Sequence, residues 1–453
     1  MAISSAGIGS NIDVNSLVSQ LLALERRPLD RLVARKAQYD SEISSYGTIS
    51  SDLSAFQTAL AKLKSSDSFK VFTASAANST YLTVSAGSTA TAGSHSITIT
   101  QLAQSQKLFS GTFADTTTTT LGTGSLTIAN GASSFAVTID SSNNTLDGIV
   151  NAVNAVSSNF GVSASIVNDG TGYRLLLSPN DTGTAFAVTV AVSDTGDGLN
   201  TDTNGLSRLS YTTGGFNLSQ TQAAQNAIIT VDGLTGINKA SNTVTDVIQG
   251  VTLNLLTGGG VSTTLDVAVD TATLTTNATE VVTAYNKLIT DINSFHAKDG
   301  ALESDNTLLT IQSQLVGIFN KPAALSGNAY TYLAEIGITL QSDGTLALNT
   351  TEFENAVSGN LNDVVKLLTD TNEGFFQRLY TEASTLLQSD GVIDAKTDGI
   401  NAQIASLDTR IDQFETRLIS VEARLRKQFS ALDALLGTLS STSTLLSGRL
   451  GIY

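Results

Sequence analysis

An apolar heptad repeat near the C-terminus, over residues 400–439, is the strongest pattern in the chain. Two interleaved series of apolar residues recur every seven positions, and Gln428 interrupts the second series. Charged residues flank this seam, as they do in a coiled coil with apolar a and d positions. Such a helix is roughly 60 Å long at 1.5 Å per residue, and it needs a partner to bury its stripe. The two series consist of Ile404, Ile411, Leu418, Leu425, Leu432 and Leu439, and of Ile400, Leu407, Phe414, Val421 and Leu435.

A second amphipathic segment, over residues 38–64, offers that partner near the other end of the chain. Antiparallel pairing of the two stripes would bring the chain ends together. We predict that the middle of both helices forms an intramolecular core, because most helical stripes face the core of a domain. In this core we expect Leu418 to pack on the face that runs from Tyr46 to Phe56. The predicted stalk core consists of Tyr39, Tyr46, Leu53, Phe56, Leu60, Ile404, Leu407, Ile411, Phe414, Leu418, Val421 and Leu425.

A shorter helical stretch lies upstream, with Asp13 or Asn15 as the predicted N-cap. Pro28 is predicted to end or kink this helix, because proline lacks an N–H group and clashes with the preceding turn. The apolar residues of the outermost segments should lack partners in an isolated subunit, so we expect those segments to be loosely ordered there and to serve in assembly. The candidate assembly residues are Leu17, Leu21, Leu24, Leu32, Leu439, Leu445 and Leu446.

The N-terminal stretch resembles the start of the flagellar filament-cap family, hook-associated protein 2. In that family a glycine-rich run leads into a helix that contains a Leu-Val-Ser-Gln-Leu motif, a glutamate and a proline. Further landmarks of the family follow in the same order at residues 97–103, 231–233, 241–244, 248–253, 284–288, 336–338 and 343–346. The N-terminal matches are Gly7, Ile8, Gly9, Ser10, Leu17, Val18, Ser19, Gln20, Leu21, Glu25 and Pro28.

The resemblance implies a structural protein, not an enzyme, that caps the bacterial flagellar filament. It implies a homo-oligomeric ring at the distal tip, of about five copies within a range of roughly four to six. This ring would promote the folding and insertion of flagellin and prevent the loss of exported flagellin. The chain would be secreted through the flagellar type III pathway without a cleaved signal peptide, and an export chaperone would assist it. The resemblance also raises contact with host mucin or another glycan.

Between the helical ends, from about residue 71, the apolar period changes to the alternation of β-strands. Strand patterns continue to about residue 269, with one helical stretch over residues 146–156, and helical spacing returns at 273–296. We predict an α+β multidomain fold, in which both chain ends form a helical, coiled-coil stalk and two nested β-rich domains lie between them. The predicted parts are terminal assembly segments 1–40 and 437–453, a helical stalk domain 41–74 and 273–436, a first β-rich domain 75–112 and 223–272, and an inserted outer β-rich domain 113–222.

The composition of the chain argues against several classes of function. The 453 residues carry a net charge of −16 and no cysteine, which excludes disulfides and thiolate chemistry. Residues 75–270 hold four basic and twelve acidic residues, a balance that argues against binding nucleic acid or an anionic membrane surface. No apolar run of about 18 residues occurs, so we expect no membrane insertion. The first 30 residues lack the pattern of a secretory signal peptide.

Few residues of the sequence are candidates for a catalytic or metal-binding site. His95 and His296 are the only histidines, and no nucleophile elbow, P-loop or Rossmann motif accompanies them, so we expect neither an enzyme nor a cofactor. Within residues 194–205, the spacing of Asn200, Asp202, Asn204 and Gly205 copies the start of a calcium loop. The twelfth position, counted from Asn200, is Tyr211, where a bidentate glutamate is needed. An acidic solvent loop is therefore favoured over a metal site. The ligands of the disfavoured metal site would be Asp194, Asp197, Asn200, Asp202 and Asn204.

Two alternatives remain at this point. The first is another flagellar axial protein, either a flagellin or a hook–filament junction protein, since those families also place helices at both termini. The second is a secreted calcium-dependent adhesin or carbohydrate-binding module. That alternative predicts a functional 194–205 loop and dispensable terminal helices.

Overall fold

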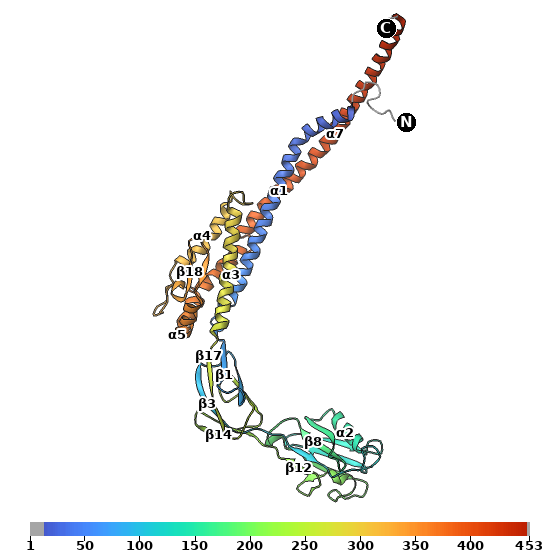
Figure 1. The fold of residues 1–453 in the computed structure, drawn as a ribbon, viewed down its shortest axis with the longest axis vertical. Helices are drawn as coiled ribbons and strands as arrows, with labels where there is room; N and C mark the ends of the chain where they lie inside the picture. The colour runs from blue at the N-terminus through green and yellow to red at the C-terminus, as the bar shows by residue number, and fades with distance from the viewer. Residues whose placement is uncertain (1–12, 451–453) are drawn as a thin grey trace. The chain divides into compact units, whose positions relative to one another are not determined.

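The computed structural model describes residues 13–450, which divide into two compact units. The helical unit comprises Met1–Phe69 and Thr271–Tyr453, and the β unit comprises Lys70–Asp270. The predicted α+β multidomain class is confirmed, with helices at both ends of the chain and β-sheets between them (Figure 1). Two parts of the sequence predictions lie outside the described residues. These are the family matches at Gly7, Ile8, Gly9 and Ser10, and the last residues of the predicted C-terminal assembly segment.

The helical unit is built around two long helices from opposite ends of the chain. These are α1 (Val14–Ala61) and α7 (Val392–Leu450), and α3 (Thr271–His296) and α6 (Phe375–Leu387) pack against α1. The remaining elements of this unit are η1 (Ser66–Phe69), α4 (Asn306–Asn320), η4 (Leu333–Ile336), β18 (Ile338–Leu340), β19 (Leu346–Leu348) and α5 (Thr350–Thr369).

The core of the helical unit forms where the C-terminal half of α1 meets α3 and α6. The apolar face of α1 is fully buried here, because its heptad stripe points at two other helices rather than at one. The Tyr285 ring of α3 lies between Phe56 and Phe319, with ring centroids 5.5 and 5.2 Å away. The buried residues of this face are Tyr46, Ile49, Leu53, Phe56 and Leu60.

The buried hydroxyl group of Tyr285 is expected to contribute nothing to the stability of the helical unit. Its side chain is fully buried, and its hydroxyl oxygen has no hydrogen-bond partner among the described residues. Burial also raises the pKa of Tyr285, so the phenol stays neutral. Removing an unpaired buried hydroxyl abolishes its desolvation cost, so Tyr285→Phe should leave the free energy of unfolding unchanged or raise it by up to about 1 kcal/mol. Urea denaturation measures this difference, and a loss larger than about 1 kcal/mol would mean that the hydroxyl has a bound partner such as water.

The β unit holds two separate hydrophobic cores, each covered by its own strands. The inner core lies between a five-stranded sheet of order β1-β17-β3-β13-β14 and a three-stranded sheet of order β15-β16-β2. The inner strands come from both ends of the unit: β1 (Phe72–Ala76), β2 (Leu82–Ala86), β3 (Gly93–Gln101), β13 (Ala227–Val231), β14 (Leu234–Lys239), β15 (Thr243–Val244), β16 (Val251–Leu255) and β17 (Val261–Val269).

The outer core is enclosed by two further sheets, of order β11-β10-β9-β5-β6 and β12-β4-β8-β7, together with α2 (Leu146–Ala155). The sequence predicts that residues 107–109 belong to the inner domain, but β4 pairs with β8 and Leu108 lies in the outer core. The outer elements are β4 (Lys107–Phe109), β5 (Gly124–Ala129), β6 (Ser134–Ile139), β7 (Val162–Asn168), β8 (Tyr173–Pro179), η2 (Thr184–Phe186), β9 (Thr189–Asp194), η3 (Gly205–Leu209), β10 (Tyr211–Thr212), β11 (Gly215–Phe216) and β12 (Ser219–Gln222).

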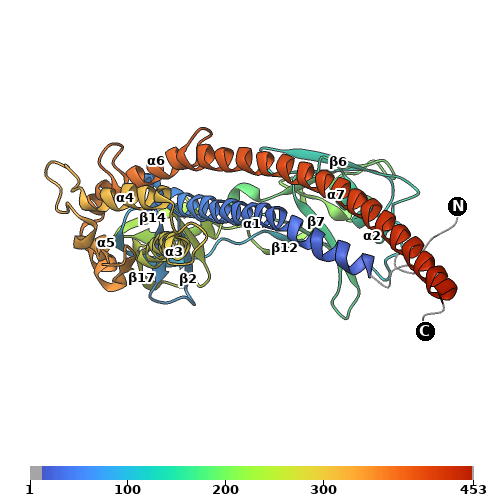
Figure 2. The ribbon, with the colours of Figure 1, turned by 90° about the horizontal axis from the view of Figure 1, so that it is seen from above.

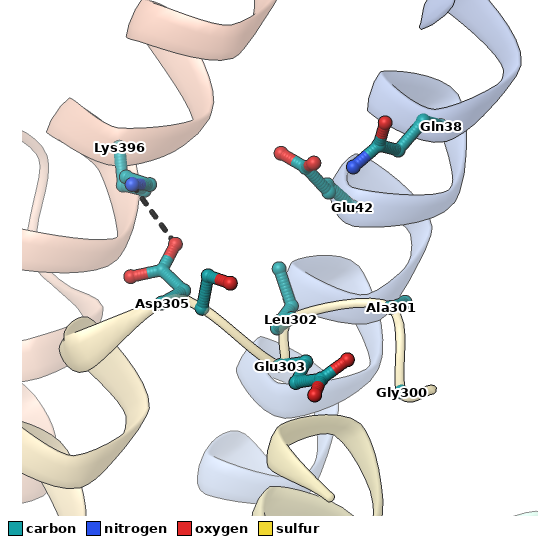
Figure 3. Close-up of a pocket in the computed structure, with 9 residues that line it drawn as sticks. Gln38, Glu42, Gly300, Ala301, Leu302, Glu303, Asp305 and Lys396 are labelled. Atoms are coloured by element: carbon teal, nitrogen blue, oxygen red, sulfur yellow. Dashed lines mark ion pairs between the residues drawn. The ribbon is translucent and has the colours of Figure 1, made fainter. Parts of the chain in front are cut away.

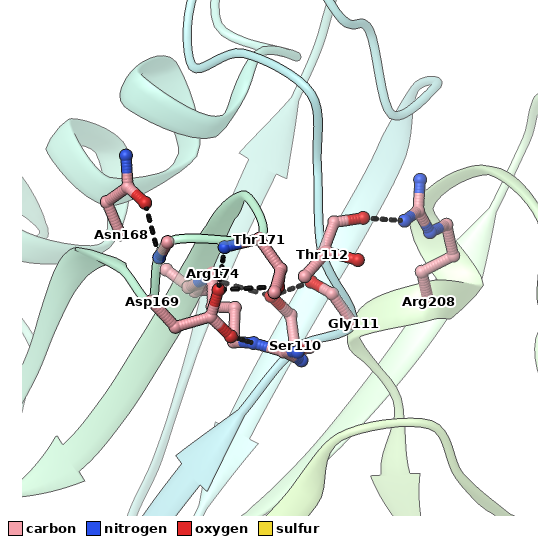
Figure 4. Close-up of polar contacts among 10 residues, drawn as sticks. Ser110, Gly111, Thr112, Asn168, Asp169, Thr171, Arg174 and Arg208 are labelled. Carbon is pink, nitrogen blue, oxygen red and sulfur yellow. Dashed lines mark hydrogen bonds and ion pairs between the residues drawn. The ribbon is translucent and has the colours of Figure 1, made fainter.

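Two of the basic residues of the β unit hold the loop that follows β4 (Figure 4). Arg174 donates through Nη1 to the carbonyl of Ser110 at 3.0 Å, and Arg208 donates through Nη2 to the carbonyl of Thr112 at 3.0 Å. Arg208 also lies over the ring of Phe113, 3.8 Å from its centroid, and burial lowers the pKa of its guanidinium. These two cations therefore stabilise the loop through backbone carbonyls and an aromatic ring.

Candidate functional site

The N-terminal half of α1 pairs with α7 in antiparallel fashion, and the two helices lie side by side in both views (Figures 1 and 2). Two polar contacts fix their register. Lys36 Nζ lies 2.7 Å from the Asp408 carboxylate, and Arg426 Nη1 donates to the Asn15 side-chain oxygen at 3.1 Å. The start of α1 therefore lies beside residues near 426 of α7.

This register contradicts one packing prediction. Leu418 shares a groove with Leu22, Ala23 and neighbouring residues of α1, and does not pack on the Tyr46–Phe56 face. Tyr46 instead lies near Ile393, at the start of α7. A heptad repeat identifies the face of a helix that needs a partner, but all of its heptads look alike, so it does not determine the register.

The helix is also longer than expected, because α1 does not end at Pro28. A proline inside a helix costs about 3 kcal/mol through its missing hydrogen bond and its clash. Here Leu29, the residue after Pro28, is buried, and Val18 on the preceding turns of α1 is buried as well. Packing of these side chains against α7 offsets the cost of the proline. Asp13 is the N-cap, and its carboxylate accepts a hydrogen bond from the Ser16 N–H at 2.9 Å.

The structure places the predicted stalk residues in two groups. Those of the central core are fully buried, and those of the long pair are mostly half-buried, because a two-helix pair covers each seam from one side only. Buried are Tyr46, Leu53, Phe56, Leu60, Leu407 and Val421; half-buried are Tyr39, Ile404, Ile411, Phe414, Leu418 and Leu425.

The candidate assembly residues lie on the paired segment of α1 and on the C-terminal part of α7. Leu32 is half-buried, and the other six are exposed: Leu17, Leu21, Leu24, Leu439, Leu445 and Leu446. The sequence interpretation missed Val14, Val18 and Leu29, which face α7 within the segment expected to lack a partner. Their spacing of four and eleven residues, typical of one helical face, was present in the sequence as a signal.

The C-terminal part of α7 continues beyond the start of α1 (Figure 1). It extends about 30 Å from residue 430 to residue 450 at 1.5 Å per residue. The heptad positions Leu432 and Leu439 are exposed along it, and Leu445 reaches 71% exposure. Asp433 and Arg449 are its only charged residues. Among residues 13–450 no second helix covers this part of α7, and an exposed apolar stripe with few charges is typical of an interface.

A polar joint connects α1, α4 and α7 near the base of this pair (Figure 3). Asp305 is the N-cap of α4 and accepts from the Thr307 N–H at 2.9 Å. The same carboxylate accepts from the Tyr46 hydroxyl at 2.6 Å and pairs with Lys396 Nζ at 2.9 Å. Burial opposes its ionisation, but these bonds outweigh burial and hold the pKa of Asp305 well below its usual range. Asp305 lines a polar cavity of about 290 Å³, together with Glu42, whose pKa burial raises.

The candidate calcium loop uses its side chains to shape itself. Asp194 is buried, and its carboxylate accepts hydrogen bonds from the backbone N–H groups of Gly196 and Leu206 at 2.8 and 2.7 Å. Asn200 accepts from the Asp194 N–H, Asp197 from the Leu199 N–H, and Asp202 from the Asn204 side chain. In the described part of the chain, no cluster of three or more His, Cys, Asp or Glu side chains could hold a metal ion.

The two histidines do not form a joint site. His95 lies in the β unit, with Nδ1 2.7 Å from the Asp232 carboxylate, and His296 ends α3 in the helical unit. Over residues 13–450 no helix is both long and apolar enough to cross a membrane. The exposed apolar residues of α1 and α7 stay the predicted assembly site.

Comparisons with known proteins identify one family along most of the chain. The family "Flagellar hook-associated protein 2 N-terminus" matches residues 10–106, "Flagellin hook IN motif" matches 125–181, and "Flagellar hook-associated protein 2 C-terminus" matches 224–441. Flagellar hook-associated protein 2 of Escherichia coli K12 is 33% identical over 98% of this chain and 97% of its own length. The B-type flagellar hook-associated protein 2 of Pseudomonas aeruginosa is 32% identical over 96% and 94%.

A solved structure extends the comparison to the fold. The crystal structure of the flagellar cap protein FliD D1-D2-D3 domains from Escherichia coli is similar with a TM-score of 0.65 and 34% sequence identity. The similarity covers 79% of this chain and 99% of that chain. Together, the nested fold, the paired terminal helices and these similarities show that the chain belongs to the flagellar hook-associated protein 2 family, the structural cap proteins of the bacterial flagellar filament.

Proposed function

We propose that this chain forms a closed homo-oligomeric ring at the distal tip of the flagellar filament, where it promotes the folding and insertion of flagellin and prevents its loss. The observation that carries the proposal is the C-terminal part of α7, whose apolar heptads continue beyond the helix that covers the rest of the stripe. Apolar stripes of this kind on a helix need a partner outside the subunit.

The ring contains about five copies in this proposal, and a head-to-tail contact closes it when the rotation between neighbours returns to the first copy. The action is steric and conformational, so it needs no catalytic residue and no cofactor. The chain reaches the tip unfolded through the flagellar type III channel, without a cleaved signal peptide and with an export chaperone. These features are carried over from the family.

The rival functions find less support. A calcium-dependent adhesin would need the 194–205 loop for metal, but Asp194 uses its carboxylate for backbone N–H groups. It would also leave the apolar stripe of α7 without a role. Contact with host mucin or glycan has no residue of this chain behind it, and we therefore do not include it in the proposal.

Leu445→Asp tests the role of the α7 extension. The side chain is 71% exposed, so the carboxylate stays solvated and the melting temperature of the subunit should not change. At the filament tip the same carboxylate would be buried without a partner, which costs several kcal/mol. We expect cells that depend on this variant as their cap protein to lose swimming and to release flagellin into the medium.

The matched control is Leu309→Asp on α4, which is also exposed but lies outside the C-terminal part of α7. Cells with this variant should swim normally. Light scattering of the unmodified full chain should show a closed oligomer. A monomer at high concentration, or normal swimming with Leu445→Asp, would contradict the proposed function.

A further inference from the structure

A groove of about 310 Å³ lies along one side of the α1–α7 pair. Leu22 and Ala23 of α1 line it, and so do Leu418 and Ile419 of α7. Ile419 is 69% exposed, so the groove presents apolar surface to solvent. Ser19, Arg26 and Glu422 complete its lining. The two charged side chains already have partners, because Arg26 pairs with Asp30 at 3.5 Å and Glu422 pairs with Arg426 at 2.8 Å. The groove is therefore shaped for apolar side chains rather than for a charged ligand.

An apolar stripe lies at the same height on α1, and consists of Leu17, Leu21 and Leu24. All three side chains are exposed, and Leu24 reaches 59%. At about 100° per residue, Leu17 and Arg26 lie roughly half a turn apart around the helix. Buried Val18, which faces α7, lies between the stripe and the groove. The stripe and the groove therefore occupy opposite sides of the helix pair.

Symmetry decides which surfaces can meet in a ring. In a cyclic ring every subunit sits at the same height, and the contact between neighbours joins two different patches at that height. The stripe and the groove satisfy both conditions, since residues 17–24 and 19–26 are almost the same segment of α1. Neither surface carries an unpaired charge at its centre, so contact between them buries apolar area without leaving an ion unsatisfied.

We propose that the stripe of one copy seats in the groove of the next copy, so that neighbouring stalks are joined side by side. This inference rests on the proposed ring and names the contact that links its stalks. Leu21 and Leu24 of one subunit pack against Ile419 and Leu22 of its neighbour. Each subunit offers one stripe and one groove, so the contact repeats around the ring until it closes.

The absence of cysteine from the chain allows a clean cross-linking test. Two full-length variants, Leu24→Cys and Ile419→Cys, are purified separately, unfolded together and refolded as a mixture. A short bis-maleimide cross-linker then joins thiols that lie close together. Because each chain carries one cysteine, every cross-linked pair joins two different copies. The proposal predicts that the mixture gives at least about tenfold more cross-linked dimer than either variant alone, since the stripe meets the groove and not another stripe.

The control mixture combines Leu24→Cys with Leu309→Cys, which lies on α4 and is also exposed. It should give only background cross-linking. If light scattering shows a ring but the stripe–groove pair cross-links no better than this control, the inference is wrong and the ring stands. If Leu24→Cys alone cross-links as strongly as the mixture, the stripe meets a second stripe and the groove is not its site. If the chain is a monomer, the proposed function fails first and the contact fails with it.

Discussion

Leu53→Asp is expected to unfold the helical unit, whereas Leu418→Asp should leave it folded. Leu53 is completely buried where α1 meets α3 and α6. A carboxylate without a partner costs several kcal/mol at such a position, which is comparable to the whole stability of a domain. Leu418 is half-buried beside a groove that opens to solvent, so an aspartate there can remain hydrated. Thermal melts followed by far-ultraviolet circular dichroism compare the two variants.

Leu53→Met is the matched control, since it keeps the volume and the apolar character of the side chain and should cost less than about 1.5 kcal/mol. The comparison also tests the register of the stalk helices. If Leu418→Asp lowers the melting temperature as much as Leu53→Asp, then Leu418 lies in the core, and the register set by Lys36 and Asp408 does not hold in solution.

The apolar stripes of α1 and α7 could be identified from the sequence, because the residues on the buried face of a helix recur at a regular spacing. Tyr46, Leu53 and Leu60 recur every seven residues, and all three are buried. The register between α1 and α7 has no such periodic signal in the sequence. It depends on single polar contacts such as that between Lys36 and Asp408, which are 372 residues apart. Pairing over such a separation is decided by the whole fold, and no local pattern encodes it.

The limits of prediction in the β unit have a similar cause. Alternating apolar residues show that a segment is a strand but not which sheet it joins. The short strand β4 was therefore assigned to the wrong side of the boundary between the inner and outer domains. The sequence predicts that the first helix ends or kinks at Pro28, and of these two outcomes the structure excludes an end. The preference of proline for helix ends is a local rule, and the burial of Leu29 beside it is a tertiary contact that outweighs this rule.

Only part of the candidate assembly site could be predicted from the sequence: the apolar residues could be identified, but not which of them are exposed. Exposed Leu24 and buried Val18 are both apolar residues of one helix, so composition does not separate them. Their difference lies in which side of α1 faces α7, and this is known only once the pair is assembled. The groove formed by Leu22 and Ile419 could not be predicted at all, because its two sides come from opposite ends of the chain.

Asp305→Ala should destabilise the helical unit by about 3 kcal/mol, because this one carboxylate caps α4 and also binds side chains of α1 and α7. Its side chain is only 12% exposed, and it receives bonds from Tyr46, Lys396 and the Thr307 N–H. Losing an N-cap costs about 1 kcal/mol. A further hydrogen bond contributes about 1 kcal/mol, and one that involves a charged group contributes about 1.5 kcal/mol or more. The half-buried Lys396 also loses its ionic partner. Urea denaturation at neutral pH measures the total loss.

The dependence on pH separates the charge of Asp305 from its hydrogen bonds. The pKa of Asp305 is held well below its usual range in the folded state, whereas in the unfolded chain it is about 3.9. Its stabilising contribution is therefore complete above about pH 4 and is lost as the pH falls toward the folded-state pKa. Asp305→Asn keeps a cap and an acceptor for Tyr46 but has no charge to titrate. We expect the difference in unfolding free energy between the natural chain and Asp305→Asn to shrink as the pH falls below about 4, and Lys396→Met to reduce that difference at neutral pH. A difference that stays constant down to about pH 2 would show that Asp305 carries no stabilising charge, and that the joint is held by its neutral hydrogen bonds alone.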